Sequence, residues 1–326
     1  SDTWQRLIQD EPNSRAADQA RYKLAQLANA EEKFEKSVAL YDEILTADRD
    51  PSLIPYALYG KGWSLIQLGK YDAALSALDQ VLRDNNQHPV RNDAVLARGI
   101  TLRNLGRLDD AKIDLESYLT VPPQGTNLGH TLYELALIDQ KQNAPGKAAQ
   151  RLERLVAEVP DYPSMDKVLY ELGWSHRESG NDDAAVRQFT HLIKRYGETP
   201  LAAEAAYFVG QKQYAAGSWD QAIEQFRIAA ENSDDPLLSE KAFYRLGWCH
   251  FKSSDYQSAD AAFQQQASKF PNGKLALDAK LMVGECRFKQ SKFETALAAY
   301  EVARQQIRQS DDKAKSVRDP AERKLR

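Results

Sequence analysis

The feature that most constrains this chain is a period of 37 residues, which recurs in register over most of its 326 residues. In steps of 37 from Gly247, every position holds glycine or alanine; twelve residues later comes another small residue, and sixteen residues later comes Tyr, Leu or Phe. A repeat of this length is one supersecondary unit that packs on its neighbours, so we expect a linear array of units. The eight positions, called anchors below, are Ala25, Gly62, Gly99, Ala136, Gly173, Gly210, Gly247 and Gly284.

Each copy is predicted to form two amphipathic helices joined by a short break. In the copy anchored at Gly62, the first helix is expected over residues 55–68 and ends at Gly69. Glycine and asparagine adopt the left-handed backbone conformation that ends many helices at the lowest cost. An acidic residue follows in the first turn of most second helices, where it offsets the positive end of the helix. The predicted breaks are Gly69, Gly106, Asn143, Gly180, Gly217, Ser254 and Ser291.

The repeat also divides the chain. Residues 1–12 are predicted to be a half repeat, the second helix of a truncated unit, because Trp4 stands 37 residues before Tyr41 in the aromatic column. We therefore expect the parent polypeptide to continue upstream. Residues 18–303 hold the eight units, and residues 304–326 are predicted to be a charged C-terminal extension or a truncated unit.

Composition excludes several classes of protein. A formal net charge of −4 gives no electrostatic basis for binding nucleic acid, and no run of about 18 apolar residues is present to span a membrane. The two cysteines, Cys249 and Cys286, stand one repeat apart. Packed helices lie about 8–10 Å apart, too far for a disulfide between equivalent positions, so both are predicted to be small core residues.

The spacing of Leu172-Gly173, Gly180, Ala185 and Phe189 resembles the tetratricopeptide repeat, with extra residues in the turn between units. The turn at Phe270-Pro271-Asn272-Gly273 is similar to that of a bacterial envelope subclass found in Tol–Pal-associated and barrel-assembly proteins. The resemblance implies an all-α fold, a right-handed α-solenoid superhelix. It also implies a concave groove, lined by the first helices, that binds peptides or partner proteins. For the location it favours the periplasm or cell envelope, with the cytoplasm as the alternative.

Positions −6, −3, +1, +4 and +5 from each anchor fall on one stripe of the first helix, because an α-helix has 3.6 residues per turn. This first-helix stripe is rich in aromatic side chains, which serve as rigid anchors at binding sites. The alternative is that the rings pack between neighbouring first helices, and both interpretations stay open. The candidate partner-binding residues are Tyr59, Trp63, Arg103, Tyr133, Tyr170, Trp174, Arg177, Tyr207, Tyr214, Tyr244, Trp248 and Phe251.

No constellation for catalysis stands out. The five histidines are scattered, no Cys/His cluster has zinc spacing, and neither a phosphate-binding loop nor a nucleophile elbow is present. We therefore predict a non-enzymatic scaffold without cofactor or metal, which binds a peptide or partner protein in the concave groove. The alternatives are a self-assembly module of a larger envelope complex and a glycan-binding envelope protein. The sequence leaves homo-oligomerisation open.

Overall fold

The computed structural model describes the backbone of residues 2–84, 88–120 and 125–322, and the side chains in these ranges except Asp84 and residues 308–322. Over these residues the fold is all-α, with seventeen helices and no strand. Contacts divide the chain into two compact units, Ser1–Met165 and Asp166–Arg326, which are described separately.

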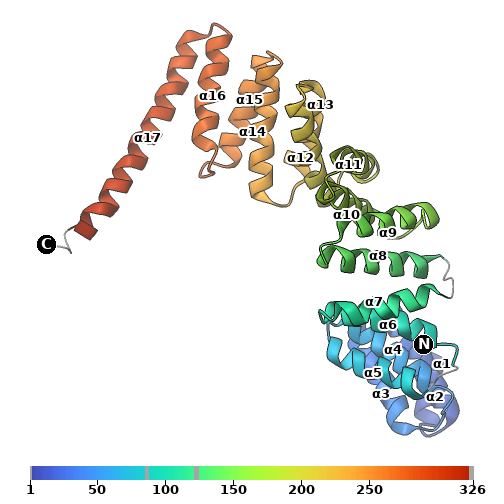
Figure 1. Ribbon diagram of the computed structural model, residues 1–326. Coiled ribbons are helices and arrows are strands. Elements are labelled where there is room, and N and C mark those ends of the chain that lie inside the picture. The colour runs from blue at the N-terminus through green and yellow to red at the C-terminus, as the bar shows by residue number, and fades with distance from the viewer. Residues whose placement is uncertain (1, 85–87, 121–124, 323–326) are drawn as a thin grey trace. The chain divides into compact units, whose positions relative to one another are not determined.

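In the first unit, consecutive helices lie beside one another as a series of hairpins, drawn in blue to green in Figure 1. Its helices are α1 (Asp2–Asp10), α2 (Arg15–Ala30), α3 (Phe34–Ala47), α4 (Ile54–Gln67), α5 (Tyr71–Asp84), α6 (Arg91–Asn104), α7 (Leu108–Leu119), α8 (Thr126–Lys141) and α9 (Pro145–Glu158).

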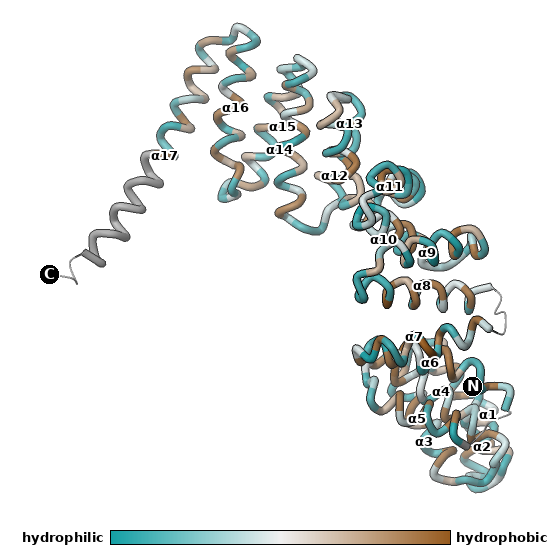
Figure 2. Tube along the Cα trace, viewed as in Figure 1, coloured by the Kyte–Doolittle hydropathy of each residue, from teal (hydrophilic) through white to brown (hydrophobic). Residues whose placement is uncertain are grey.

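The second unit continues with the same kind of hairpin. On helices α1–α16, hydrophobic and hydrophilic residues are interspersed, as expected for helices with one packed face (Figure 2). Its helices are α10 (Met165–Glu178), α11 (Asp182–Tyr196), α12 (Pro200–Ala215), α13 (Trp219–Asn232), α14 (Pro236–Lys252), α15 (Tyr256–Lys269), α16 (Ala276–Lys289) and α17 (Phe293–Glu322).

The breaks between the two helices of each hairpin are left-handed, as predicted. All seven predicted break residues have positive φ, from 56° at Asn143 to 79° at Gly106. At the Gly69 break, the Lys70 amide donates to the Leu65 carbonyl at 2.9 Å, which closes the end of α4. Glu32, one repeat before Gly69, has the same conformation with φ 58°, although its side chain gave no signal of it.

The anchors are small because a side chain from the second helix fills their space. A Cβ atom on Gly173 would stand 2.4 Å from Cε1 of Phe189, which is fully buried. A Cβ atom on Gly247 would stand 2.7 Å from the equivalent atom of Phe263. The small residue at the anchor and the large residue sixteen positions later therefore form one interlocking contact, repeated along the chain.

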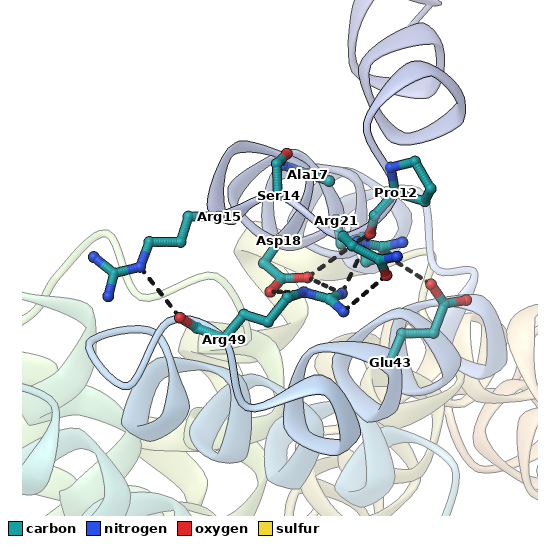
Figure 3. A network of polar contacts seen from close by, with 9 residues as sticks. Pro12, Ser14, Arg15, Ala17, Asp18, Arg21, Glu43 and Arg49 are labelled. Carbon is teal, nitrogen blue, oxygen red and sulfur yellow. Dashed lines mark hydrogen bonds and ion pairs between the residues drawn. The ribbon is translucent and has the colours of Figure 1, made fainter.

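A buried charge network joins α2 to the connection between α3 and α4 (Figure 3). The Asp18 carboxylate, 0% exposed, accepts hydrogen bonds from Arg49 Nη2 at 2.9 Å and Arg21 Nη1 at 3.0 Å. Arg21 Nε in turn donates to Glu43 Oε2 of α3 at 2.8 Å. Both arginines also donate to the carbonyl of Pro12, so the network ties α2, α3 and the α1–α2 turn together.

Cys249 and Cys286 are both buried and not disulfide-bonded, as predicted. The charged segment predicted from residue 304 continues the backbone of α17 as far as Glu322. Its side chains from residue 308 onward lie outside the described residues.

Candidate partner-binding surface

All twelve candidate residues lie on first helices, namely α4, α6, α8, α10, α12 and α14. Eleven of their side chains are half-buried, and Arg177 is exposed. The structure gathers five of the twelve into two clefts, one in each unit.

The first cleft lies between α2 and α4 and has a volume of about 420 Å³. Tyr59 and Trp63 form one side of it. The rest of its lining comes from α2 (Tyr22, Gln26, Asn29 and Ala30), from α3 (Tyr41) and from α4 itself (Tyr56 and Gly60).

This cleft carries no formal charge. Burial raises the pKa of Tyr59 to about 12, so its hydroxyl is protonated at physiological pH. Gln26 Nε2 donates to the hydroxyl oxygen of Tyr22 at 3.1 Å, which orients an amide beside the aromatic rings. The first cleft can therefore offer ring faces, hydroxyl groups and amide groups to a neutral ligand segment.

The second cleft has a volume of about 330 Å³ and lies among α10, α12 and α14. Three candidate residues line it, Trp174, Arg177 and Tyr207. The other lining residues are Glu204, Phe208, Gln211, Asp235, Leu238 and Lys241.

Charged and aromatic groups are combined in the second cleft. The guanidinium carbon of Arg177 lies 4.7 Å from the ring centroid of Trp174 and 5.3 Å from that of Phe208, which are cation–π distances. The Tyr170 hydroxyl, at the rim of this cluster, donates to the Glu204 carboxylate. Both signs of charge are thus present beside the Trp174 and Phe208 rings, which are tilted relative to each other.

The two clefts are built from the same repeat positions. Positions +1 and +4 of one first helix face positions −6, −3 and +1 of the next. Tyr56, Glu204 and Lys241, all at position −6, were not among the candidates. The signal that identifies them was available, because position −6 belongs to the predicted stripe.

Two candidates of the first unit are held by neighbours outside the clefts. Arg103 forms an ion pair with Glu134 of α8, and both side chains are largely buried. Burial raises the pKa of Glu134, while the neighbouring Arg103 lowers it. The ring of Tyr133 lies 6.3 Å from that of Tyr162. These contacts of Arg103 and Tyr133 are those expected from the alternative interpretation, in which stripe residues pack against neighbouring helices.

In the second unit, Tyr244, Trp248 and Phe251 form a chain of edge-to-face rings along α14, with centroids 6.3 and 5.6 Å apart. The ring centroid of Tyr214, on α12, lies 4.8 Å from that of Trp219. The rings of this unit also touch the core, because Trp174 lies 5.4 Å from Phe189 and Trp248 lies 6.2 Å from Phe263. Packing and surface presentation thus occur together in the same side chains.

The described residues hold no group of three or more His, Cys, Asp or Glu side chains arranged to bind a metal ion. Among the helices described, none is both long and apolar enough to cross a membrane.

Helical hairpins that pack in sequence order, with small anchors against large residues, define the class of α-solenoid proteins. Two family models identify the repeat within this class. One, described as "Tetratricopeptide repeat-like domain", matches residues 162–319, and another, "Tetratricopeptide repeat", matches residues 59–122. The chain therefore contains tetratricopeptide repeat domains. Neither match identifies the envelope subclass, which stays a prediction.

Solved structures with the same fold have low sequence identity to this chain. The C-terminal part of a tetratricopeptide repeat-containing protein from Cytophaga hutchinsonii is 15% identical, with a TM-score of 0.62 over 79% of this chain and 98% of that chain. The apo form of RapI is 13% identical, with a TM-score of 0.58 over 88% of this chain and 85% of that chain. PilF of Pseudomonas aeruginosa is 15% identical, with a TM-score of 0.51 over 69% of this chain and 96% of that chain. No curated protein matches the chain.

Proposed function

We propose that this protein is a non-enzymatic scaffold whose first-helix stripe binds a segment of a partner protein. Tetratricopeptide repeat proteins generally mediate protein–protein interactions, which supports the general role. The partner and the use of this stripe are the specific parts of the proposal.

One observation carries the proposal: two clefts in separate units are built from the same repeat positions. Each combines at least one indole, one or more tyrosines and polar side chains within a few hundred cubic ångströms. Tyrosine, tryptophan and arginine are the residues that most often dominate binding energy at protein interfaces. A surface that repeats such a cleft suits an extended ligand that contacts several repeats at once.

The chemistry of the clefts indicates what the ligand offers to each. The neutral first cleft suits an apolar or aromatic side chain followed by backbone amides that bond to Gln26 and to the tyrosine hydroxyl groups. The second cleft is lined by Arg177, Glu204, Asp235 and Lys241, so it suits a segment that carries both signs of charge. We place the protein in the cell envelope as part of this proposal, on the resemblance of its inter-repeat turn.

Affinity capture from a native extract tests the proposal, with wild-type protein compared with the Trp63→Ala and Trp174→Ala double variant. We expect one captured protein that is lost with the variant, since each deletion removes a ring that lines a cleft. Trp4→Ala is the matched control, because Trp4 is a half-buried indole on α1 that lines neither cleft. Thermal unfolding of all variants controls for loss of structure.

Identical capture by the wild type and the double variant would contradict the proposal. Loss of the captured protein with Trp4→Ala as well would indicate a general effect of deleting an indole, and would also count against the proposal.

A further inference from the structure

A cavity of about 560 Å³ lies among α3, α4 and α5, apart from the two clefts of the proposed function. We call it the α3–α5 cavity. Leu45 and Leu58 contribute apolar surface to its lining, and Lys61 contributes its one cation. Lys61 Nζ lies 2.5 Å from Oδ1 of Asp42, which also lines the cavity. The volume is within the range of about 300–1,000 Å³ that is usual for sites of small molecules.

Lys61 stands at a repeat position where charge is rare. It directly precedes the anchor Gly62, and in six of the eight repeats this position holds Leu or Val. Arg98, one repeat later, is the only other charged residue there. Each of the two cations forms an ion pair with an aspartate of the preceding second helix, Asp42 for Lys61 and Asp79 for Arg98. Because Asp42 and Asp79 are also one repeat apart, the two sites are copies that can be compared residue by residue.

The copy around Arg98 contains a second carboxylate, that of Asp114. Arg98 Nε and Nη2 donate to its two oxygens, each at 2.7 Å, and Asp114 is only 6% exposed. The guanidinium is therefore held between two aspartates. The cavity that remains there, among α5, α6 and α7, has a volume of about 200 Å³.

In the α3–α5 cavity, Ala77 stands at the position that Asp114 holds one repeat later. Ala77 is also 6% exposed, but its methyl group offers no acceptor to Lys61. Among the described residues, Asp42 is the one ion-pair partner of Lys61. A lysine ammonium has three donors, so it can bond to a second carboxylate as Arg98 does. Alanine in place of aspartate also explains why this cavity is the larger of the two.

We propose that the α3–α5 cavity binds a small carboxylic acid with an apolar chain. The carboxylate of the ligand bonds to Lys61 as the Asp114 carboxylate bonds to Arg98, and the chain lies against Leu45 and Leu58. Charge-assisted hydrogen bonds of this kind are about twice as strong as neutral ones.

The other polar groups of the lining are compatible with an anion. Ser76 and Gln80 of α5 carry donors that can reach a bound carboxylate. Asp48 is exposed, so solvent and salt screen its charge. The Asp42 side chain is 49% exposed, more than that of Asp79 at 36%, which already lies beside a second carboxylate.

The test uses the full chain with ¹³C-labelled alanine methyl groups, titrated at pH 7 with hexanoate. Hexanamide and hexylamine serve as the neutral and cationic counterparts. We expect hexanoate to shift the methyl signal of Ala73, which lines the cavity, and not that of Ala30, which lines the first cleft. Hexanamide should bind about tenfold more weakly, because it lacks the charge that pairs with Lys61.

Two variants test the role of the carboxylate. Ala77→Asp supplies from the chain the group that the ligand brings, so hexanoate should bind about tenfold more weakly. Lys61→Met removes the cation with little change in length, and should weaken hexanoate by a similar factor while leaving hexanamide unchanged. Thermal unfolding of each variant controls for loss of structure.

Ile113→Asp is the control for added charge, because it places an aspartate on the second helix α7, where residue 113 is 66% exposed. It should leave the affinity for hexanoate unchanged. Trp63→Ala with Trp174→Ala should leave it unchanged too, so that failure of the cleft proposal and failure of this one can be told apart.

Stronger binding of hexylamine than of hexanoate at Ala73 would overturn the proposal, because the aspartates would then define a site for cations. The proposal would also be wrong if hexanoate did not shift Ala73, or if Ala77→Asp or Lys61→Met bound hexanoate as well as the wild type does.

Discussion

At the scale of one residue, Gly173 shows why the anchor of a repeat is small. The ring of Phe189 occupies the volume that a side chain at position 173 would need. Gly210 is less tightly enclosed, since a Cβ atom there would stand 3.0 Å from the nearest atom of Phe226. The same sequence position thus tolerates different amounts of added volume in different repeats.

Gly173→Ala is expected to lower the free energy of unfolding by about 1–3 kcal/mol, the usual range for overpacking a core. Gly210→Ala should cost less or be neutral, because the gain in helix propensity of about 1 kcal/mol offsets a smaller clash. Chemical denaturation of both variants measures the difference. Equal losses in the free energy of unfolding at the two positions would show that the space around the anchor does not determine the cost of adding a methyl group.

Seven of the eight left-handed breaks were predicted, and Glu32 was not. Five of the seven are Gly or Asn, whereas Ser254 and Ser291 were predicted from their place in the repeat. Glycine and asparagine adopt positive φ at low energetic cost and therefore indicate such a break, whereas glutamate has no such preference. The break at Glu32 is imposed by its place one repeat before Gly69, between two helices that pack whatever residue joins them. The period, rather than local preference, therefore identifies it.

At the scale of an element, α2 is held by charge as well as by apolar packing. Asp18 is fully buried and its charge is compensated by Arg21 and Arg49, which come from α2 itself and from the α3–α4 connection. Removing one member of a buried network leaves the others buried without compensation, which costs much more than the loss of a surface ion pair.

Asp18→Asn is therefore expected to destabilise the region by about 3–5 kcal/mol. Arg154→Ala, which breaks the exposed pair with Glu158 on α9, should cost less than about 1 kcal/mol. Amide hydrogen exchange of α2 and α3 provides the measurement. Unchanged protection of these helices in Asp18→Asn would show that the network contributes little to holding them.

The element scale also explains why the candidate site was only partly predictable. The stripe follows from 3.6 residues per turn, but which stripe residues meet depends on how neighbouring first helices approach. Arg103 illustrates this, because Glu134, at position −2 of the next first helix, was outside the stripe and forms an ion pair with it. Phe208 stands at the same −2 position and stacks on Arg177. Pairing between +4 and −2 becomes visible only once the helices are in place.

At the scale of the whole molecule, the all-α hairpin fold was predictable from the sequence because the residues that specify it recur every 37 positions. One repeat leaves several interpretations open, but eight copies in register restrict helix, break and packing residue together. The ligand is not determined in this way, since arrays of one fold serve unrelated partners. In the proposed function, that information lies in the side chains of the first-helix stripe, which vary from repeat to repeat.

The most direct test of the central claim is site-specific photo-cross-linking with a photoreactive amino acid at Gln26, Gln211 or Ile113. Gln26 and Gln211 line the two clefts, whereas Ile113 is 66% exposed on the second helix α7. The account predicts that one partner protein is cross-linked from Gln26 and Gln211 and not from Ile113. Cross-linking of that partner from Ile113 alone would contradict it, and would place the binding surface on the second helices.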